Sequence, residues 1–547
     1  MTAPGREPAH GPEAAAAAPV SIVVIGHDDT AHLAEAVRSA LAQGPAVREV
    51  VAVDDGSTDG SAELLTRLAA GEPRLTVVRR PVNSGGCGTP RNTGMDAVTS
   101  PYLMFLDSDD VLPLGAVDAL LTAANAGRAE VASGLCVRRE LPSGRERPWQ
   151  AALYRAPSVV THPARRPRLV HDTLCVNKLY RTDFLREHGI RFPEGRFLYE
   201  DFVFTARVLA AGPRIALVPH PVYVWHVRRS ADRLSLSLDR AGIANWLART
   251  AACALAYDIL LGAGQKELAR AARAKFLDHE LRMYARELEL HDEPYRRAWW
   301  AHTRAYLARY DAADWEADPT APGRLLARVV LESPTPRDLP RLKELAARPA
   351  RLRPPYARAP GGTPIWSDDL PQVSLARLLI RPTRLLPLAM DAELHPRARA
   401  SRLRLRLHEL YGRVAQAGPE EVEVEWRSRE NEAAAPHRTT AAFSPSPSSD
   451  GTWSAEVPVE PAALGAGTWD LRLLVRFADG TRRALTAHAV EGPGLLRRRV
   501  LPSARHGVLL LQPYATHSGA LALRVAPGLR GAMTVVRGRL RRLLHWR

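Results

Sequence analysis

The stretch that decides the fold reads Tyr102-Leu103-Met104-Phe105-Leu106-Asp107-Ser108-Asp109-Asp110, a largely apolar run followed at once by acidic residues. Such a run is typical of a buried strand in a parallel sheet. Three similar runs precede it, and leucines and valines at helical spacing lie between them. The runs are Ser21–Ile25, Val50–Val53 and Leu75–Val78. We therefore expect an α/β domain over residues 20–240, with a parallel sheet covered by helices.

Polar residues suited to ligand binding follow three of the expected strands. They are His27-Asp28, Asp54-Asp55 and Asp107-Ser108-Asp109. The carboxyl ends of parallel strands meet at one crevice, where ligands of open α/β sheets bind. Asp107 and Asp109 can present oxygens to Mg²⁺ or Mn²⁺, as a bound diphosphate requires. A lone Asp-x-Asp is more often a turn that ends a strand, but the second acidic cluster favours a ligand site.

Two loops add groups that can contact a nucleotide. In Asp54-Asp55-Gly56-Ser57-Thr58-Asp59, helix capping explains the polar residues after the glycine. One of the two leading carboxylates could accept a hydrogen bond from a base N–H. In Arg91-Asn92-Thr93-Gly94, Arg91 can meet the base or the phosphates. The preceding glycine-rich loop is not a phosphate loop, because it lacks Gly-Lys-Ser/Thr.

Together these segments resemble, in order and spacing, the nucleotide-binding half of the family 2 inverting glycosyltransferases with the GT-A fold. The resemblance runs from Val20 to about Arg229. It implies that Asp107 contacts the ribose and metal region and that Asp109 holds a divalent metal, Mn²⁺ or Mg²⁺, on the diphosphate. It also implies that His27 and Asp55 contact the base, which we expect to be uracil. The expected nucleotide-sugar-binding residues are His27, Asp28, Asp55, Arg91, Asp107, Ser108, His226 and Arg228.

One departure from the family concerns the end of the first strand. The family usually has Pro-x-Tyr-Asn there, and this chain has Ile25-Gly26-His27-Asp28. A histidine in place of the aromatic residue alters the surface on which the base would stack.

The acceptor half contains the acidic pair Glu200-Asp201. An inverting transfer needs one base that removes the proton of the acceptor hydroxyl. A bare Glu-Asp pair also favours a helix N-terminus through the macrodipole. The resemblance places the catalytic Asp in such a pair, so Asp201 is the expected base and Glu200 would orient the acceptor or the base. In similar enzymes the region of His226 and Arg228 lies over the diphosphate, although a histidine beside aromatic residues is more often a packed structural residue.

Composition divides the rest of the chain. Residues 1–19 are expected to be a disordered leader and 241–347 a helical region. A Pro/Gly linker is expected over 348–371 and an all-β immunoglobulin-like sandwich over 372–492. A basic segment is expected over 493–547, with strands at 507–512 and 520–525. Alternating apolar residues and the hairpin signal Asp479-Gly480 indicate the sandwich. This layout resembles the wall teichoic acid glycosyltransferases, which act on poly(ribitol phosphate).

Charge narrows the class of partner. With 75 Lys and Arg against 59 Asp and Glu, the net charge is +16. Such an excess favours nucleic acid, a membrane surface or an acidic substrate. No zinc pattern or helix-turn-helix spacing supports nucleic acid. We therefore expect a nucleotide-sugar donor and an anionic glycopolymer or lipid-linked acceptor. A basic, Trp-containing end over 529–547 could make peripheral contact with a membrane. The alternative is a solvated or self-packed terminal segment, which the glycines there support because they disfavour a helix.

The cysteines indicate where in the cell the protein is expected to act. The four cysteines are widely spaced and favour a reduced, cytoplasmic protein, which would meet the membrane at its inner face. A homo-oligomer is compatible with the sequence. The alternative to an enzyme is a non-catalytic carbohydrate- or polyanion-binding scaffold built on a GT-A domain. The sequence does not specify the sugar, the acceptor or the linkage.

Overall fold

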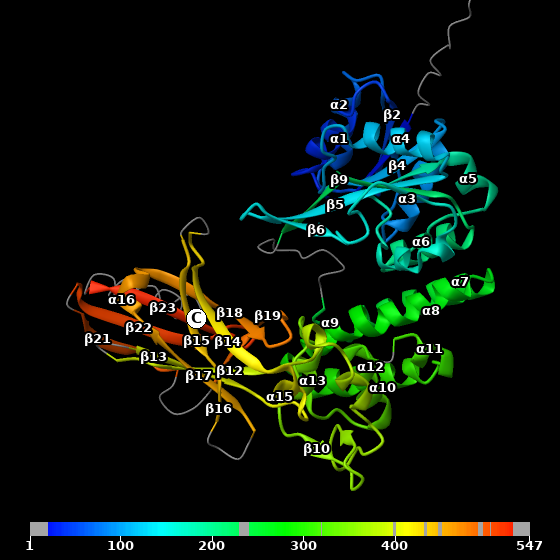
Figure 1. Ribbon diagram of the computed structural model, residues 1–547. Coiled ribbons are helices and arrows are strands. Elements are labelled where there is room, and N and C mark those ends of the chain that lie inside the picture. Colours follow the sequence, from blue (N-terminus) through cyan, green and yellow to red (C-terminus); the bar gives the residue numbers. More distant parts are fainter. Residues whose placement is uncertain are drawn as a thin grey trace, which may run out of the picture. The chain divides into compact units, whose positions relative to one another are not determined.

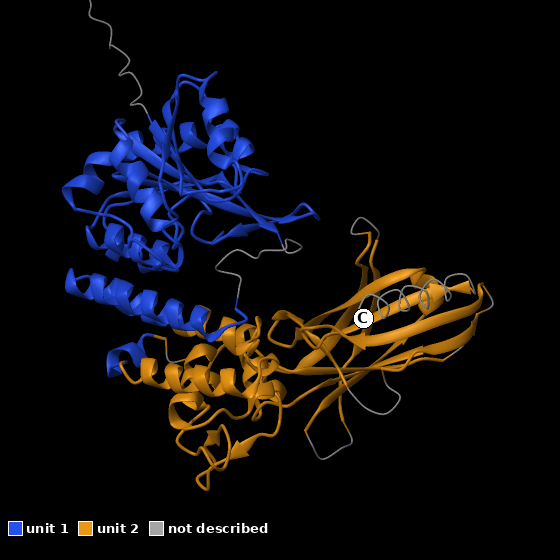
Figure 2. Cartoon of the chain, turned by 180° about the vertical axis from the view of Figure 1, so that it is seen from behind, with its two compact units in different colours: residues 1–276, 310–317 blue, residues 277–309, 318–547 orange. Residues whose placement is uncertain are grey.

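The structure, a computed structural model, describes residues 20–228, 240–318, 320–397, 401–431, 435–446, 451–490, 496–503 and 505–528. The chain forms two compact units, 1–276 with 310–317, and 277–309 with 318–547 (Figure 2). The expected leader and the basic end over 529–547 lie outside the described residues. Among the described residues, no helix has both the length and the apolar character needed to span a membrane.

The first unit is built on one mixed sheet with the strand order β3-β2-β1-β4-β8-β5-β9-β7, with β6 paired to β5 (Figure 1). The four strands predicted from the apolar runs are present and parallel. Strand β8 is antiparallel to both of its neighbours, β4 and β5. The bounds are β1 Val20–Gly26, β2 Val47–Asp54, β3 Leu75–Arg79, β4 Tyr102–Asp107, β5 Val131–Leu141, β6 Arg145–Trp149, β7 Ser158–Val160, β8 Lys178–Arg181 and β9 Ile215–Arg228.

Amphipathic helices connect these strands and bury their apolar faces on the sheet. In the first of them, Leu33, Ala36, Val37 and Ala40 are buried at helical spacing. The helices are α1 Leu33–Leu41, α2 Ser61–Ala69, α3 Gly88–Ala97, α4 Ala116–Gly127, α5 Thr182–Glu187, α6 Glu200–Ala210, α7 Ile243–Gly262 and α8 Lys266–Lys275. The α/β expectation for this part of the chain is confirmed.

The first unit extends beyond residue 240, where the sequence suggested a boundary. Helix α7 packs against α6 and α8. Trp246 of α7 is fully buried, with its ring 5.7 Å from that of Phe276. Helix α11 (Ala312–Glu316) also joins this unit, and its Asp314 forms a buried ion pair with Arg273 of α8. The alanine-rich composition of 241–276 predicts helices correctly, but it carries no sign of which unit they complete.

The second unit begins with helices and includes the segment expected to be a linker. The helices are α9 Arg282–Ala285, α10 Glu293–Leu307, α12 Pro322–Glu332 and α13 Leu339–Ala346. Residues 348–371 are not a free connector, since Leu352 and Trp366 are fully buried. The Trp366 Nε1–H donates to Asp338 Oδ2 at 2.7 Å. The prolines end helices here, but the apolar residues between them pack against their own unit.

Two all-β sheets complete the second unit. One has the order β16-β17-β13-β12-β20, and the other has β15-β14-β18-β23-β22-β21, with β19 paired to β18. Alternate residues are buried, as in β13. The bounds are β12 Met390–His395, β13 Ser401–Leu407, β14 Pro419–Ser428, β15 His437–Ala442, β16 Ser444–Pro445, β17 Trp453–Val459, β18 Gly467–Phe477, β19 Arg482–Leu485, β20 Ala487–Ala489, β21 Arg499–Ser503, β22 Gly507–Ala515 and β23 Leu521–Pro527.

The all-β expectation is confirmed, but its expected end at 492 is too early. Strands β21, β22 and β23 come from the segment expected to be a separate basic end, and β23 lies between β18 and β22. The hairpin predicted at Asp479-Gly480 joins β18 and β19, with Gly480 at φ +79°. The strands expected at 507–512 and 520–525 are present as β22 and β23, but the sequence did not show that they join the sandwich.

The glycine of the Arg91-Asn92-Thr93-Gly94 segment has a packing role. A Cβ added at Gly94 would lie 2.2 Å from Cγ1 of Val23, a fully buried residue of β1. Helix α3 can therefore lie directly on the sheet only with glycine at this position.

We predict that Gly94→Ala lowers the free energy of unfolding of the first unit by about 1–3 kcal/mol, because the clash outweighs the better helix propensity of alanine. Gly71→Ala is the matched control, since nothing lies within 4 Å of its added Cβ. It should change the free energy by less than about 0.5 kcal/mol. Denaturant unfolding of the two variants measures both values, and equal stabilities would contradict the packing role of Gly94.

Candidate active site

Three strands bring their polar ends to one edge of the sheet. Gly26 of β1 lies opposite Asp54 of β2, and Ile25 lies opposite Asp107 of β4. The loops that follow these positions therefore meet at one edge of the sheet, at the carboxyl ends of the parallel strands.

Asp28 and Ser108 hold the crevice loops together. Asp28 Oδ1 accepts a hydrogen bond from the Thr58 N–H at 2.7 Å, and the Asp28 N–H donates to Ser57 Oγ at 3.0 Å. Ser108 Oγ donates to Asp29 Oδ2 at 2.7 Å. Both residues, predicted to bind the nucleotide, thus have a structural task at the edge of the site. His27 lies beside them with 31% of its side chain exposed and its Nε2 3.4 Å from Asp28 Oδ2.

The two carboxylates after β2 have different surroundings. Asp55 accepts from Arg80 Nε at 2.7 Å through Oδ1, and from the Ser84 hydroxyl at 2.7 Å through Oδ2. The Asn83 amide also donates to Oδ2, at 3.2 Å. Oδ2 of Asp55 thus has three donors from its own chain and Oδ1 has one, so the surrounding loops hold this carboxylate in place.

Asp54 is the better acceptor for a base N–H. Its Oδ2 accepts from the Ser57 N–H at 3.3 Å, and its Oδ1 is buried with no hydrogen-bond partner in the structure. A buried carboxylate oxygen without a partner is costly, and a ligand donor would relieve that cost. The sequence showed the pair of carboxylates, but nothing in it distinguished the two.

Arg91 lies at the centre of a buried ion-pair cluster. Its Nη2 is 2.7 Å from Asp107 Oδ1, and its Nη1 is 2.6 Å from Glu200 Oε1 and 3.3 Å from Asp201 Oδ1. Only 3% of the Arg91 side chain is exposed. We expected the guanidinium at the base or phosphates, and the structure gives it three carboxylates instead. One cation therefore joins the donor side of the site, Asp107, to the acidic pair at the start of α6.

Burial and mutual repulsion change the acid strength of that pair. Burial, and next the charge of Asp201, raise the pKa of Glu200 to about 7, although Arg91 opposes them. Burial also raises the pKa of Asp201, against the opposing charge of Arg91 and a hydrogen bond from the Cys175 thiol. A carboxylate with a raised pKa takes up a proton more readily, which suits a general base.

Asp109 is held by two residues at the end of β9. His226 Nδ1 and Arg228 Nη1 each lie 3.1 Å from the Asp109 carbonyl oxygen, and Arg228 Nη1 is 3.3 Å from Asp109 Oδ2. Burial, followed by the charge of Asp107, raises the pKa of Asp109 to about 6. Burial lowers the pKa of His226, so the ring is neutral at neutral pH and Arg228 is the cation beside Asp109.

Tyr223 and Asp110 support this part of the site, and neither was predicted. The Tyr223 hydroxyl donates to Asp110 Oδ2 at 2.7 Å and accepts from the Asp107 N–H at 3.3 Å. Asp110 Oδ1 accepts from the His226 N–H at 2.8 Å. This network ties β9 to the turn after β4. The acidic run after that strand made Asp110 visible in the sequence, but its partner on a distant strand was not.

Asp107 and Asp109 suit a divalent cation in the chemistry of their atoms. Their side chains are 32% and 45% exposed, and the charge of one raises the pKa of the other, so a cation would relieve their repulsion. Among the described residues, no three His, Cys, Asp or Glu side chains gather to hold an ion by themselves. Mg²⁺ is commonly held by one or two carboxylates together with substrate phosphates, so two carboxylates are enough.

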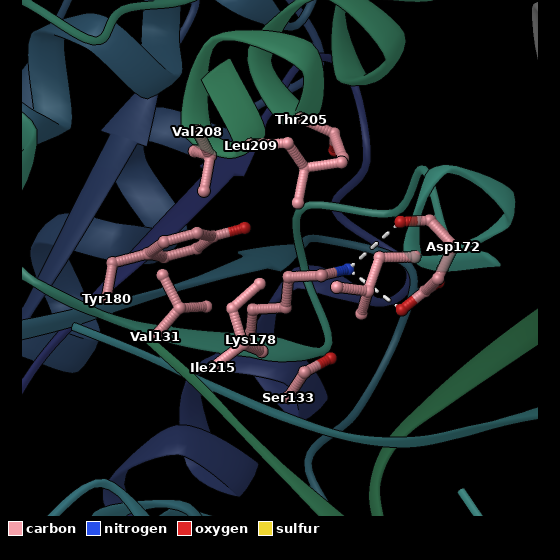
Figure 3. A pocket seen from close by; sticks show the side chains of 10 residues that line it. Val131, Ser133, Asp172, Lys178, Tyr180, Thr205, Val208, Leu209 and Ile215 are labelled. Carbon is pink, nitrogen blue, oxygen red and sulfur yellow. Dashed lines mark hydrogen bonds and ion pairs between the residues drawn. The ribbon is translucent and has the colours of Figure 1, made fainter. Parts of the chain in front are cut away.

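A small cavity is lined by residues of β5, β8 and α6, and Figure 3 shows the Lys178 side chain pointing toward Asp172 within it. Lys178 Nζ is 2.9 Å from Asp172 Oδ2, and Asn177 donates to the same oxygen at 3.1 Å. The space open to the centre of a water molecule is about 20 Å³. That volume fits a water but not a sugar. The Asn177–Tyr180 segment is therefore part of the support of the acceptor half.

Known proteins were compared with the chain. The model of the family described as Glycosyl transferase family 2 matches residues 21–189. The succinoglycan biosynthesis protein ExoO of Rhizobium meliloti is 30% identical over 226 residues, which are 40% of this chain and 64% of that protein. The poly(ribitol-phosphate) beta-glucosyltransferase of Bacillus spizizenii is 29% identical over 189 residues, 35% of this chain and 29% of that enzyme.

Two further matches concern Staphylococcus aureus. The poly(ribitol-phosphate) beta-N-acetylglucosaminyltransferase TarS is 27% identical over 217 residues, 39% of this chain and 36% of that enzyme. The crystal structure of TarS matches with a TM-score of 0.51 and 17% identity, over 93% of this chain and 85% of that one. The sequence matches span less than two thirds of each relative's own length. The structural match supports the fold of the chain.

The converging strand ends, the strand order and the match over residues 21–189 agree with one another and with the resemblance stated from the sequence. Residues 21–189 therefore form a domain of the kind that the Glycosyl transferase family 2 model describes.

Proposed function

We propose that the chain transfers a sugar, with inversion, from a UDP-linked donor to a hydroxyl group of an anionic cell-surface polymer or its lipid-linked precursor. One observation carries this proposal: Arg91 contacts Asp107 at the donor crevice and the Glu200-Asp201 pair at the start of α6. Relatives named for poly(ribitol-phosphate) and succinoglycan support a polymer acceptor, and the net charge of +16 suits an anionic one.

In this mechanism Asp201 is the general base. It takes the proton of the acceptor hydroxyl while that oxygen attacks the anomeric carbon. The bond between that carbon and the diphosphate oxygen breaks in the same step, and the electron pair leaves with the diphosphate. Because the attack comes from the face opposite the leaving group, the anomeric configuration inverts. Glu200, bound to the same guanidinium, keeps the neighbouring carboxylate in place.

The donor side binds the nucleotide and receives the leaving charge. We propose that Asp54 accepts the base N–H through its buried Oδ1 and that His27 lines the base site. Asp107 and Asp109 would hold Mn²⁺ or Mg²⁺, which neutralises charge on the diphosphate. Arg228 is the cation paired with Asp109, since its Nη1 lies 3.3 Å from Asp109 Oδ2. The neutral ring of His226 fixes the Asp109 backbone by its hydrogen bond to the carbonyl.

A screen of sugar nucleotides tests the function. We expect at least one UDP-sugar to release UDP when a polyol-phosphate polymer is present. The same screen with Asp201→Asn should show no transfer, while the variant still binds the donor, because the amide cannot take the proton. If the wild-type chain transfers no sugar with any of the donors and polymers, the result favours the non-catalytic scaffold. Transfer by Asp201→Asn at a rate near that of the wild type would contradict the role of Asp201.

Metal dependence is tested by binding. We expect the affinity for UDP to fall at least tenfold on chelation of divalent ions, since the charge on the diphosphate then loses its counter-ion. Asp109→Asn should bind UDP weakly with or without Mn²⁺. Asp96→Asn is the matched control, because Asp96 pairs with Arg191 at the surface. Isothermal titration calorimetry gives the affinities. If the wild type binds UDP equally well with and without Mn²⁺, the metal site is refuted.

The pH dependence should report the buried pair. Burial raises the pKa of both carboxylates, so transfer is expected to slow as the pH falls, because protonated Asp201 cannot accept a proton. Arg91 lowers the pKa of both carboxylates, so Arg91→Gln should move this loss of rate to higher pH by about one unit or more. Arg91→Lys keeps the positive charge and should therefore shift the pH at which the rate is lost by a smaller amount. Transfer rates measured between pH 5 and 9 test this expectation. If Arg91→Gln has the same pH profile as the wild type, the acidic pair is not the source of the pH dependence.

A further inference from the structure

The residue just before the acidic pair has an unusual backbone. Tyr199 adopts the left-handed conformation, with φ +64° and ψ +36°, and α6 begins at the next residue, Glu200. A bulky residue rarely takes this conformation, and it persists only where surrounding contacts hold it. The direction in which Glu200 and Asp201 leave this turn therefore depends on what holds Tyr199.

Helix α7 supplies those contacts. The Tyr199 hydroxyl donates to Asn245 Oδ1 at 2.6 Å, and both residues are buried, with 9% and 6% of their surfaces exposed. The guanidinium carbon of Arg249, one turn further along α7, lies 4.2 Å from the centre of the Tyr199 ring. A polar anchor and a cation over the ring face thus fix both the reach and the tilt of this side chain.

Arg249 and a second cation, Lys275, also contact the ring of Phe202 in α6. Arg249 also lies 5.4 Å from the centre of the Phe202 ring, and Lys275 Nζ, at the end of α8, lies 4.3 Å from it. Phe202 follows Asp201 directly, so contacts from α7 and α8 lie on both sides of the acidic pair. These helices lie outside residues 21–189, the part that the family model matches.

We propose that Tyr199, Asn245 and Arg249 are positioning residues that aim the Asp201 carboxylate at the acceptor hydroxyl. This inference rests on the proposed function of Asp201. The three residues contact neither Asp201 nor the donor crevice in any described bond, so they act through the backbone turn at the start of α6. Through Asn245 and Arg249, helix α7, which lies outside the family domain, thereby helps to position the acidic pair.

The decisive variant is Tyr199→Phe, which removes only the hydroxyl that binds Asn245. We expect kcat for transfer to fall tenfold to a hundredfold, with the donor Kd changed less than twofold, because a misaimed base slows the reaction without touching the donor site. Donor titration also gives the number of binding sites per chain. Unfolding would lower that number, whereas misaiming leaves it at the wild-type value.

Tyr257→Phe is the matched control. Tyr257 is also 9% exposed, lies on the same helix and has Arg273 over its ring at 3.6 Å. Among the described residues, no hydrogen bond or cation–ring contact joins it to the turn before α6, as Asn245 and Arg249 are joined to Tyr199. It should keep kcat within twofold of the wild type. Arg249→Ala should lose rate as Tyr199→Phe does, and Arg249→Lys, which keeps the cation, should recover part of it. Equal kcat values for Tyr199→Phe and Tyr257→Phe would overturn the proposal.

A second measurement separates this inference from the proposed function. Amide hydrogen exchange at residues 200–204 should be faster in Tyr199→Phe than in the wild type and unchanged in Tyr257→Phe, whether or not a substrate is known. If the wild type transfers no sugar, the proposed function fails and the exchange result decides whether Tyr199 holds the turn. Unchanged exchange in Tyr199→Phe would refute that role.

Discussion

The site depends on the buried guanidinium of Arg91. Three carboxylates, Asp107, Glu200 and Asp201, contact one cation whose side chain is almost inaccessible. Without that cation their negative charges would repel one another where little water can screen them. Arg91 reaches this place because Gly94, one turn along the same helix, lets α3 lie directly on Val23. A packing constraint on a small residue thus fixes the position of the central charge.

Two arginines divide the electrostatic work. Arg91 is enclosed and satisfied by acids on two sides, whereas Arg228 sits at the rim with 20% of its side chain exposed and faces Asp109 alone. The first holds the groups that must be in place before any reaction. In the proposed mechanism, the second exchanges its carboxylate partner for an oxygen of the diphosphate. Burial therefore separates a fixed cation from an available one.

The sequence predicted the sheet, the acidic strand ends and the pair Glu200-Asp201, because apolar runs and their endings are local features. It could not distinguish Asp54 from Asp55, since the difference lies in Arg80 and Ser84, which only the fold brings near. Likewise, nothing local showed that Arg91 contacts residues more than 100 positions away. The end of the first unit was misplaced for the same reason: Tyr199 and Asn245 meet only in three dimensions.

The order of the two units along the chain has a consequence for how the protein is made. Residues 310–317 belong to the first unit, although residues 277–309 before them belong to the second. During synthesis, Arg273 remains without its carboxylate partner until Asp314 has left the ribosome. No single cut in the chain separates the two units cleanly. A gene fragment that ends at residue 276 would leave a buried cation uncompensated, so recombination within this region is constrained by charge as well as by shape.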